Sequence, residues 1–145
     1  MKKILLVICI FTMLLTGCGN STTSEKKNTS ESIAKAVCDA RLGNLSYEEY
    51  IALYIPDAQD YIRNELTKDD FEELLSDDAI SDCTYVYKSA SPEEEVQWIN
   101  EDFSEEMEVS VNFSECEIYE ATVDGSYSDI YVCKYEDKWY LGYFD

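Results

Sequence analysis

The sequence predicts an α+β domain in which N-terminal helices pack on a C-terminal antiparallel sheet. Three observations lead to this fold class. Apolar residues recur at helical spacing up to about residue 75, whereas β-branched and aromatic residues dominate from residue 83 onward. The dipeptide Asp124-Gly125 separates two strand-like runs, as a hairpin turn would. Helices first and strands last are typical of α+β domains, and we expect the helices to cover one face of the sheet.

The first half of the domain is expected to be helical. A first helix is predicted to begin at Ile33 and to end near Gly43, a residue that favours helix ends. Ser46 to Glu49 match a capping box, and Pro56 interrupts the apolar stripe that follows it. Thr67 can cap one more short helix. The apolar stripes of these helices are Ile33, Ala36, Val37 and Ala40, then Tyr50, Ile51, Tyr54, Ile55, Ala58, Tyr61, Ile62 and Leu66, and last Phe71, Leu74 and Leu75.

The second half is expected to hold four strands and one more helix. A first strand is predicted over Cys83 to Tyr87, which are rich in β-favouring residues. Ser91-Pro92 can start a helix, so we expect a short one from Val96 to Phe103. Three longer strands are predicted after it, over Met107–Val123, Tyr127–Tyr135 and Lys138–Phe144.

The first eighteen residues have the pattern of an export signal. Lys2 and Lys3 precede the apolar run Ile4–Leu15, which is too short to span a membrane. The run ends in Leu15-Thr16-Gly17-Cys18, which resembles the lipobox of bacterial lipoproteins. The resemblance implies cleavage before Cys18, a diacylglyceryl group on its thiol and an acyl chain such as palmitate on its new amino terminus. Such a protein would be anchored in the membrane by its lipids on the extracytoplasmic face.

These observations divide the chain into three parts. Residues 1–17 are predicted to be the signal peptide. Residues 18–32 are predicted to be a lipidated flexible tether, since 19–32 contain no large apolar residue. Residues 33–145 are long enough for one compact core and too short for two, so we expect a single domain.

Four cysteines remain for disulfides once Cys9 is removed and Cys18 carries lipid. An even number in an exported domain suggests two bridges with three possible connectivities, the alternative being four buried thiols. If Asp124-Gly125 is a two-residue turn, Cys116 and Cys133 lie opposite each other as a non-hydrogen-bonded pair, with Cα atoms about 4.5 Å apart. By elimination, the second predicted bridge joins Cys38 to Cys83.

The same register has a cost elsewhere in the hairpin. It sets Ile118 against Tyr131, a favourable cross-strand pair, but also Glu120 against Asp129, which repel each other. A bulge or a longer turn would relieve this repulsion and move the two cysteines apart. The register of this hairpin therefore tests the predicted Cys116–Cys133 bridge.

Charge and composition exclude several classes of function. The formal net charge is −20 at pH 7, which argues against nucleic acid as a partner and favours high solubility. The chain has no histidine, so a triad with a histidine base and a histidine-ligated metal are excluded. Its acidic clusters do not match a calcium loop. We therefore expect no metal, no cofactor and no enzymatic activity.

The order of elements and the ending KYEDKWYLGYF are similar to small cone-shaped domains of the nuclear-transport-factor-like and cystatin-like superfamily, which many bacterial lipoproteins of unknown function carry. The resemblance implies a cone-like domain over residues 33–145. It implies no activity, because this fold serves enzymes and binding modules alike.

Aromatic residues are abundant, with twelve Tyr, five Phe and two Trp. They favour strands and fill cores, but on a concave sheet they can also stack on a sugar or an apolar ligand. We expect a non-catalytic binding module for an envelope protein, a peptide or a cell-wall ligand. The alternative is a small hydrolase or dehydratase that uses carboxylates and tyrosines in a cone-shaped pocket. The predicted ligand-binding residues are Trp98, Tyr131, Trp139 and Tyr140.

Overall fold

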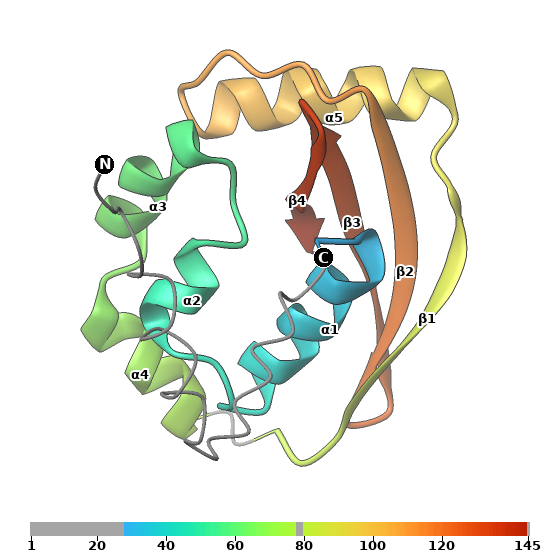
Figure 1. Ribbon diagram of the computed structural model, residues 1–145. Helices are drawn as coiled ribbons and strands as arrows, with labels where there is room; N and C mark the ends of the chain where they lie inside the picture. The colour runs from blue at the N-terminus through green and yellow to red at the C-terminus, as the bar shows by residue number, and fades with distance from the viewer. Residues whose placement is uncertain (1–27, 78–79, 145) are drawn as a thin grey trace, which may run out of the picture.

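The computed structural model describes residues 28–77 and 80–144, so the predicted signal peptide, most of the predicted tether and Cys18 lie outside the described residues. The described residues form five α-helices, one short 3-10 helix and one four-stranded antiparallel sheet in the order β1-β2-β3-β4 (Figure 1). The fold class is therefore α+β, as predicted. The elements are α1 (Ser30–Arg41), α2 (Tyr47–Ile51), η1 (Pro56–Ala58), α3 (Gln59–Glu65), α4 (Lys68–Asp77), β1 (Cys83–Ala90), α5 (Glu93–Glu106), β2 (Glu115–Val123), β3 (Ser126–Tyr135) and β4 (Lys138–Phe144).

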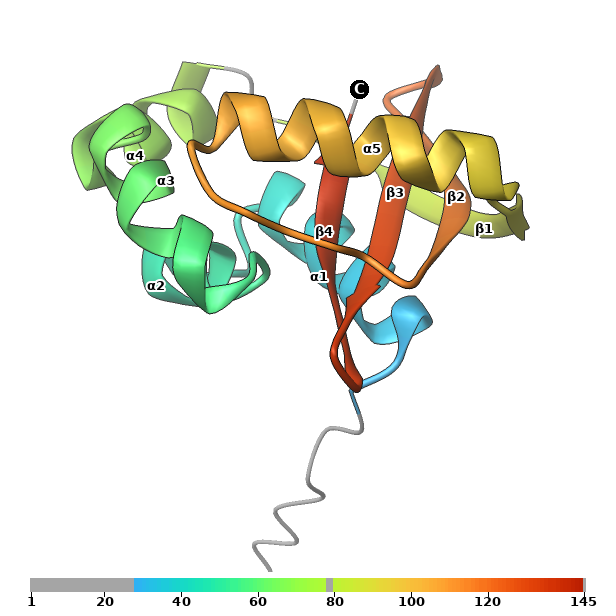
Figure 2. The same ribbon diagram turned by 90° about the horizontal axis from the view of Figure 1, so that it is seen from above.

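The two longest helices lie on opposite faces of the sheet. Ile130 and Val132 of β3 share a buried cluster with residues of α1, whereas Cys133 is buried together with residues of α5. Since neighbouring residues of a strand point to opposite faces, α1 and α5 must cover different faces. Figure 2 shows α5 in front of the strands and α1 behind them. The expectation that all helices cover one face is wrong, because α5 is inserted between β1 and β2 and crosses to the other side.

Helix α1 begins inside the segment that the sequence predicts as tether. Thr29 caps it, accepting a hydrogen bond from the backbone N–H of Ser32 at 3.1 Å while the Ser32 hydroxyl accepts one from the N–H of Thr29 at 3.0 Å. Asn28 is fastened to edge strand β4: its Nδ2 donates to the Trp139 carbonyl at 3.0 Å, and its Oδ1 accepts from the Trp139 N–H at 2.7 Å. The folded domain therefore extends to Asn28.

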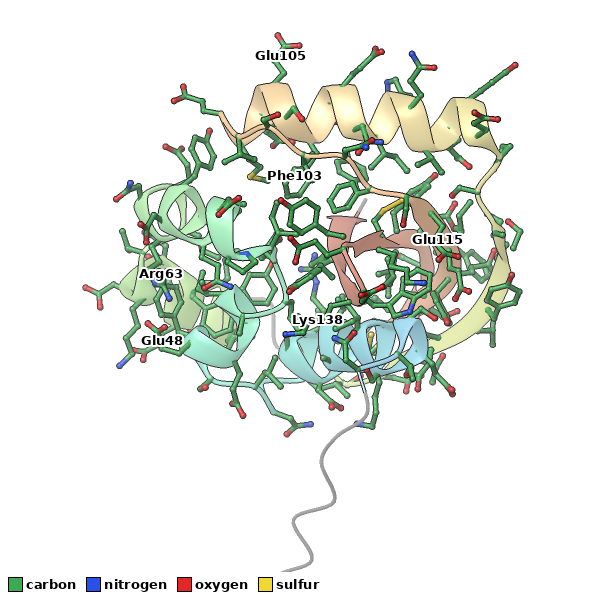
Figure 3. The ribbon with its side chains drawn as sticks, turned by 45° about the horizontal axis from the view of Figure 1, so that its top comes forward. Glu48, Arg63, Phe103, Glu105, Glu115 and Lys138 are labelled. Atoms are coloured by element: carbon green, nitrogen blue, oxygen red, sulfur yellow. A yellow bond between two sulfur atoms is a disulfide. The ribbon has the colours of Figure 1, made fainter. Side chains whose placement is uncertain are left out.

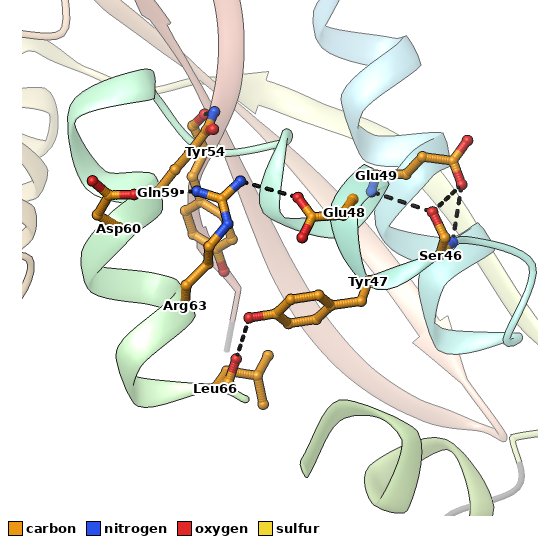
Figure 4. Close-up of polar contacts among 9 residues, drawn as sticks. All are labelled: Ser46, Tyr47, Glu48, Glu49, Tyr54, Gln59, Asp60, Arg63 and Leu66. Atoms are coloured by element: carbon orange, nitrogen blue, oxygen red, sulfur yellow. Dashed lines mark hydrogen bonds and ion pairs between the residues drawn. The ribbon is translucent and has the colours of Figure 1, made fainter. Parts of the chain in front are cut away.

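Helix α2 begins at the capping box that the sequence predicts, and side-chain contacts join it to α3 (Figure 4). The Ser46 N–H donates to the Glu49 carboxylate at 2.9 Å, and the Glu49 N–H donates to the Ser46 hydroxyl at 3.4 Å, which completes the capping box of α2. Arg63 of α3 pairs with Glu48 of α2 at 3.0 Å. Tyr47 links the same two helices, since its hydroxyl donates to the Leu66 carbonyl at 2.8 Å. These contacts hold α2 and α3 together beside the sheet.

The predicted long strand Met107–Val123 is shorter in the structure. Strand β2 begins at Glu115, and residues 107–114 run along α5 instead. Asn100 of α5 donates to the Phe113 carbonyl at 3.2 Å and accepts from its N–H at 2.6 Å, so a side chain takes the place of a neighbouring strand. Alternate residues of this segment still point to the core, which explains why its sequence resembles a strand. Figure 3 shows Phe103 pointing from α5 toward the sheet and Glu105 pointing away from it.

The β2–β3 hairpin has the predicted register. Asp124 and Gly125 have φ of 45° and 85°, as a two-residue turn of this kind requires, and Val123 pairs with Ser126. Cys116 therefore pairs with Cys133, with Cα atoms 4.0 Å apart and a disulfide between them. Ala at the buried position Gly142 would place its Cβ 2.6 Å from the Cys133 sulfur, so β4 passes the disulfide at a residue without a side chain.

Candidate functional site

An open cavity of about 410 Å³ lies on the α5 face of the sheet, beside the first turns of α5. We call it the aromatic groove. Four rings and four polar side chains line it: Trp98, Tyr127, Tyr131 and Tyr143, with Lys88, Glu120, Ser128 and Asp129. Its volume is in the range of small-molecule sites, and it combines aromatic surface with a few charged groups, as such sites commonly do.

The strand pairings bring the groove residues together. Glu120 pairs with Asp129, and Tyr131 pairs with Tyr143, so these four side chains occupy neighbouring rows of the sheet. The β3–β4 register shifts between Tyr131 and Val132 and leaves Gly142 without a partner of its own. This irregularity places Tyr143 on the same face as Tyr131.

The rings form a connected row. The ring centroids of Trp98 and Tyr143 are 6.5 Å apart, and those of Tyr143 and Tyr131 are 6.1 Å apart. Trp98 is 50% exposed and Tyr127 is 75% exposed, which is unusual for such large side chains in the described part of the chain. These two residues of the groove therefore leave much of their aromatic surface accessible to solvent.

The charges of the groove are uneven. Lys88 Nζ lies 2.9 Å from the Asp129 carboxylate, and this hydrogen bond raises the pKa of Lys88. Glu120, directly across the ladder from Asp129, also faces Lys88 and raises its pKa further. Lys88 is the extra residue of a bulge in β1, between Tyr87 and Ser89. The repulsion of Glu120 and Asp129 is thus offset by a lysine from the neighbouring strand, with no change in the hairpin register.

A third acid borders the groove. The Tyr131 hydroxyl donates a long hydrogen bond of 3.4 Å to Glu95 of α5. Burial, followed by the nearby charge of Glu95, raises the pKa of Tyr131, so this phenol keeps its proton at neutral pH. Two acidic side chains therefore line the groove and a third borders it, against one lysine.

Two of the four predicted ligand-binding residues, Trp98 and Tyr131, lie in the groove. Trp139 lies on the other face, partly buried against the α1 cluster, with Lys134 Nζ 5.6 Å from its ring centroid. Tyr140 packs against the cluster around the Cys116–Cys133 disulfide. Sequence reasoning missed Tyr127, Tyr143, Lys88, Glu120 and Asp129 as lining residues. The predicted hairpin register already placed Glu120 beside Asp129, whereas the two bulges that position Lys88 and Tyr143 have no clear sequence signal.

The predicted Cys38–Cys83 bridge is not formed in this structure, where both residues are thiols. Cys38 is buried in α1, and Cys83 is the partly buried first residue of β1. Burial, together with a hydrogen bond to Cys83, raises the pKa of the Cys38 thiol. Both residues are free thiols here, and the second bridge stays a prediction.

A carboxylate–tyrosine cluster lies on the α1 face, away from the groove. Ser30, Glu117 and Tyr119 share hydrogen bonds, with 2.9 Å between the Ser30 and Tyr119 hydroxyl oxygens and 3.1 Å from Tyr119 to Glu117. Burial raises the pKa of Tyr119 to about 12. Each member already has a partner within the cluster, which fastens the start of α1 to β2.

Further cavities occur in the described residues. A small apolar one of about 130 Å³ lies between α1, α4 and β4, a wide groove follows α5 and the segment after it, and a very small one lies between Trp98, Phe103 and Tyr143. No group of three or more metal-binding side chains occurs among the described residues. Within the same part of the chain, no helix has the length and apolarity to cross a bilayer.

Comparison with known proteins finds no matching family model, no matching curated protein and no matching solved structure.

Proposed function

We propose that the protein is a lipid-anchored binding module on the extracytoplasmic face of the membrane, attached through Cys18, and that it binds its ligand in the aromatic groove without catalysis. The observation that carries the binding role is the groove itself. Large aromatic side chains left exposed in a concave site are the usual platform for a bound ligand. The predicted resemblance to the cone-shaped domains of other lipoproteins stays a prediction.

The position of the groove supports this arrangement. Asn28 is fastened to Trp139, close to the β3–β4 turn, while the groove lies toward the opposite end of β3 at Tyr127 and Asp129. Cys18 precedes Asn28 by ten positions, which span at most about 36 Å when fully extended. An anchor at Cys18 would therefore attach the domain at its β3–β4 end, away from the end of β3 where the groove lies.

The ionisation of the groove supports binding over catalysis. The pKa of Tyr131 is raised and Lys88 is held as a cation by its ion pair, so neither group is suited to act as a base at neutral pH. The carboxylate–tyrosine cluster at Glu117 and Tyr119 lies on the other face of the sheet. We therefore favour the binding module over a hydrolase or dehydratase that would use Tyr131, Lys88 or the Glu117–Tyr119 cluster as its base.

The two tryptophans allow a direct test of the groove. Trp139→Phe leaves Trp98 as the single tryptophan of the chain, and Trp98→Phe leaves Trp139 as a matched control on the other face. The full chain in detergent micelles is titrated with soluble cell-wall glycan fragments and followed by tryptophan fluorescence. We expect a saturable change from Trp98 alone. A response from Trp139 alone, or from neither residue, would contradict the proposed site.

The anchor has its own test. Cys18→Ala should leave the protein uncleaved and free of lipid label, because the modified thiol is needed before the signal is removed in lipoproteins of this kind. The measurement is membrane fractionation with fatty-acid labelling in a bacterial host, with Cys9→Ala as the control. Normal processing and labelling of the Cys18 variant would exclude the lipoprotein assignment.

A further inference from the structure

We propose that the aromatic groove recognises a protonated amino sugar, whose ring stacks on the exposed aromatic faces while its ammonium group lies beside Glu120 and Asp129. This inference rests on the proposed binding function and names its ligand class. Three features of the groove lead to it: unbalanced negative charge, exposed ring faces and limited size.

The charge of the groove calls for a cation. Glu120 and Asp129 face each other across the β2–β3 ladder, where like charges destabilise the sheet. Lys88 approaches Asp129 at 2.9 Å and offsets one of these charges, while Glu95 adds a third carboxylate beside Tyr131. A ligand ammonium would offset the remaining repulsion. The formal net charge of −20 attracts cations to the whole molecule and repels anions.

The rings favour the same ligand. The faces of Trp and Tyr carry partial negative charge and attract cations, and they also stack on the C–H face of a sugar ring. Trp98 and Tyr127 are both at least half exposed, and both line the groove together with Glu120 and Asp129. A ring that carries an ammonium group satisfies the aromatic faces and the carboxylates at once.

The size of the groove argues for a small ligand over a basic protein surface. Its volume of about 410 Å³ falls in the lower part of the range for small-molecule sites. A stable protein partner would contact about 20–30 residues on each side, whereas eight residues line the groove. A short glycan fits this space.

The experiment compares two ligands that share one glycan backbone and differ in whether their amino groups are free or acetylated. The probes are the β-1,4-linked tetramer of glucosamine and the same tetramer fully N-acetylated, titrated into the Trp139→Phe chain at about pH 6, where the free amines carry protons. We expect the glucosamine tetramer to bind about tenfold more tightly at low salt. This advantage should shrink in about 0.5 M NaCl, because salt screens the charges.

Variants of the lining residues test which side chains cause the preference for the charged tetramer. Glu120→Gln and Asp129→Asn should each reduce the preference for the charged tetramer several-fold, while Lys88→Met should increase it by removing a competing cation. Glu105→Gln is the matched control, since this acid lies on α5 but points away from the sheet (Figure 3). An equal loss in the Glu105 variant would mean that overall charge, not the groove, attracts the ligand, and would overturn the inference.

The other outcomes separate the inference from the proposed function. Equal binding of the two tetramers, unchanged in the Glu120 variant, would overturn amine recognition and leave the binding module intact. Tighter binding of tetralysine than of the glucosamine tetramer would overturn the choice of a sugar. No response of Trp98 to any probe would count against both the inference and the proposed function.

Discussion

At the scale of single residues, a few side chains hold the sheet and its hairpins in place. Gly142 allows β4 to pass the Cys116–Cys133 disulfide, and Asp124 joins the β2–β3 turn to the start of β1. Gly142 has no side chain and Asp124 has a small one, and neither residue belongs to the two buried core clusters. Their importance comes from what lies directly beside them.

Gly142→Ala should destabilise the protein by about 1–3 kcal/mol, because the added Cβ would stand 2.6 Å from the Cys133 sulfur and 3.3 Å from the Tyr131 carbonyl oxygen. The measurement is thermal or urea unfolding of the oxidised protein. Ser126→Ala, at an exposed strand end, serves as the control and should change stability little. A Gly142 variant as stable as the parent would show that β4 can move aside at no cost.

Asp124 should make stability depend on pH. Its carboxylate accepts hydrogen bonds from the Ser81 hydroxyl at 2.8 Å and from the Asp82 N–H at 2.9 Å, and these bonds lower its pKa. A lowered folded-state pKa contributes stability above the unfolded value of about 3.9, and this contribution is lost as pH falls through the folded value. Asp124→Asn keeps a residue that tolerates positive φ but removes the charge.

The variant should therefore be less stable than the parent at neutral pH, and the difference should shrink in acid. Urea unfolding at about pH 7 and about pH 2.5 measures it. The exposed Asp137→Asn in the β3–β4 turn is a suitable control. A difference between parent and Asp124 variant that is the same at both pH values would contradict this role for the charge.

At the scale of elements, the contacts between α1 and β1 decide how firmly the first edge strand is held. Most residues of β1 are exposed, and Tyr85 is among its few that pack against the α1 cluster. Cys38 of α1 is buried, Cys83 of β1 is partly buried, and both are free thiols. A bridge there would fasten the edge strand to the helix.

Oxidation should form the Cys38–Cys83 bridge and stabilise the protein by about 4 kcal/mol, given a loop of 45 positions. Non-reducing peptide mapping detects the bond, and unfolding of the oxidised protein measures its effect. The control is Cys38→Ser with Cys83→Ser, which retains Cys116–Cys133. Alkylation of Cys38 and Cys83 in the unreduced protein would show that the pair stays as thiols, and a link from either to Cys116 or Cys133 would contradict the hairpin register.

At the scale of the whole molecule, net charge dominates the electrostatics. Thirty-one acids outnumber eleven bases. The ion pairs of Lys35, Arg63, Lys68, Lys88 and Lys134 all join side chains that are at least partly exposed, and such pairs contribute little to stability. Repulsion among the remaining acids opposes the compact state. The fold therefore depends on its two buried clusters, one on each face of the sheet.

Added salt should accordingly stabilise the protein. Raising NaCl from about 20 mM to about 500 mM shortens the Debye length several-fold, so the melting temperature should rise by a few degrees. Substituting exposed acids far from the groove by their amides should reproduce part of this rise at low salt. A melting temperature that falls with salt would show that the ion pairs outweigh the repulsion.

Local patterns in the sequence were sufficient for much of the fold. The Ser46–Glu49 capping box, the turn at Asp124-Gly125 and the resulting Cys116–Cys133 pairing depend on residues close in sequence or on a two-residue period, and all three are present in the structure. Such features are local, so the residue types that form them also identify them. Composition alone likewise determined the charge and the lack of histidine.

Tertiary structure decided which residues that are distant in sequence become neighbours in space. An alternating pattern over residues 107–113 predicts a strand, but Asn100 holds this segment against α5 instead. The bulge at Lys88 and the irregularity before Val132 bring a lysine and Tyr143 into the aromatic groove, and the crossing of α5 to the second face brings Trp98 there. These placements depend on contacts between residues far apart in the chain, which no local pattern specifies, and so the groove could be found only in the folded molecule.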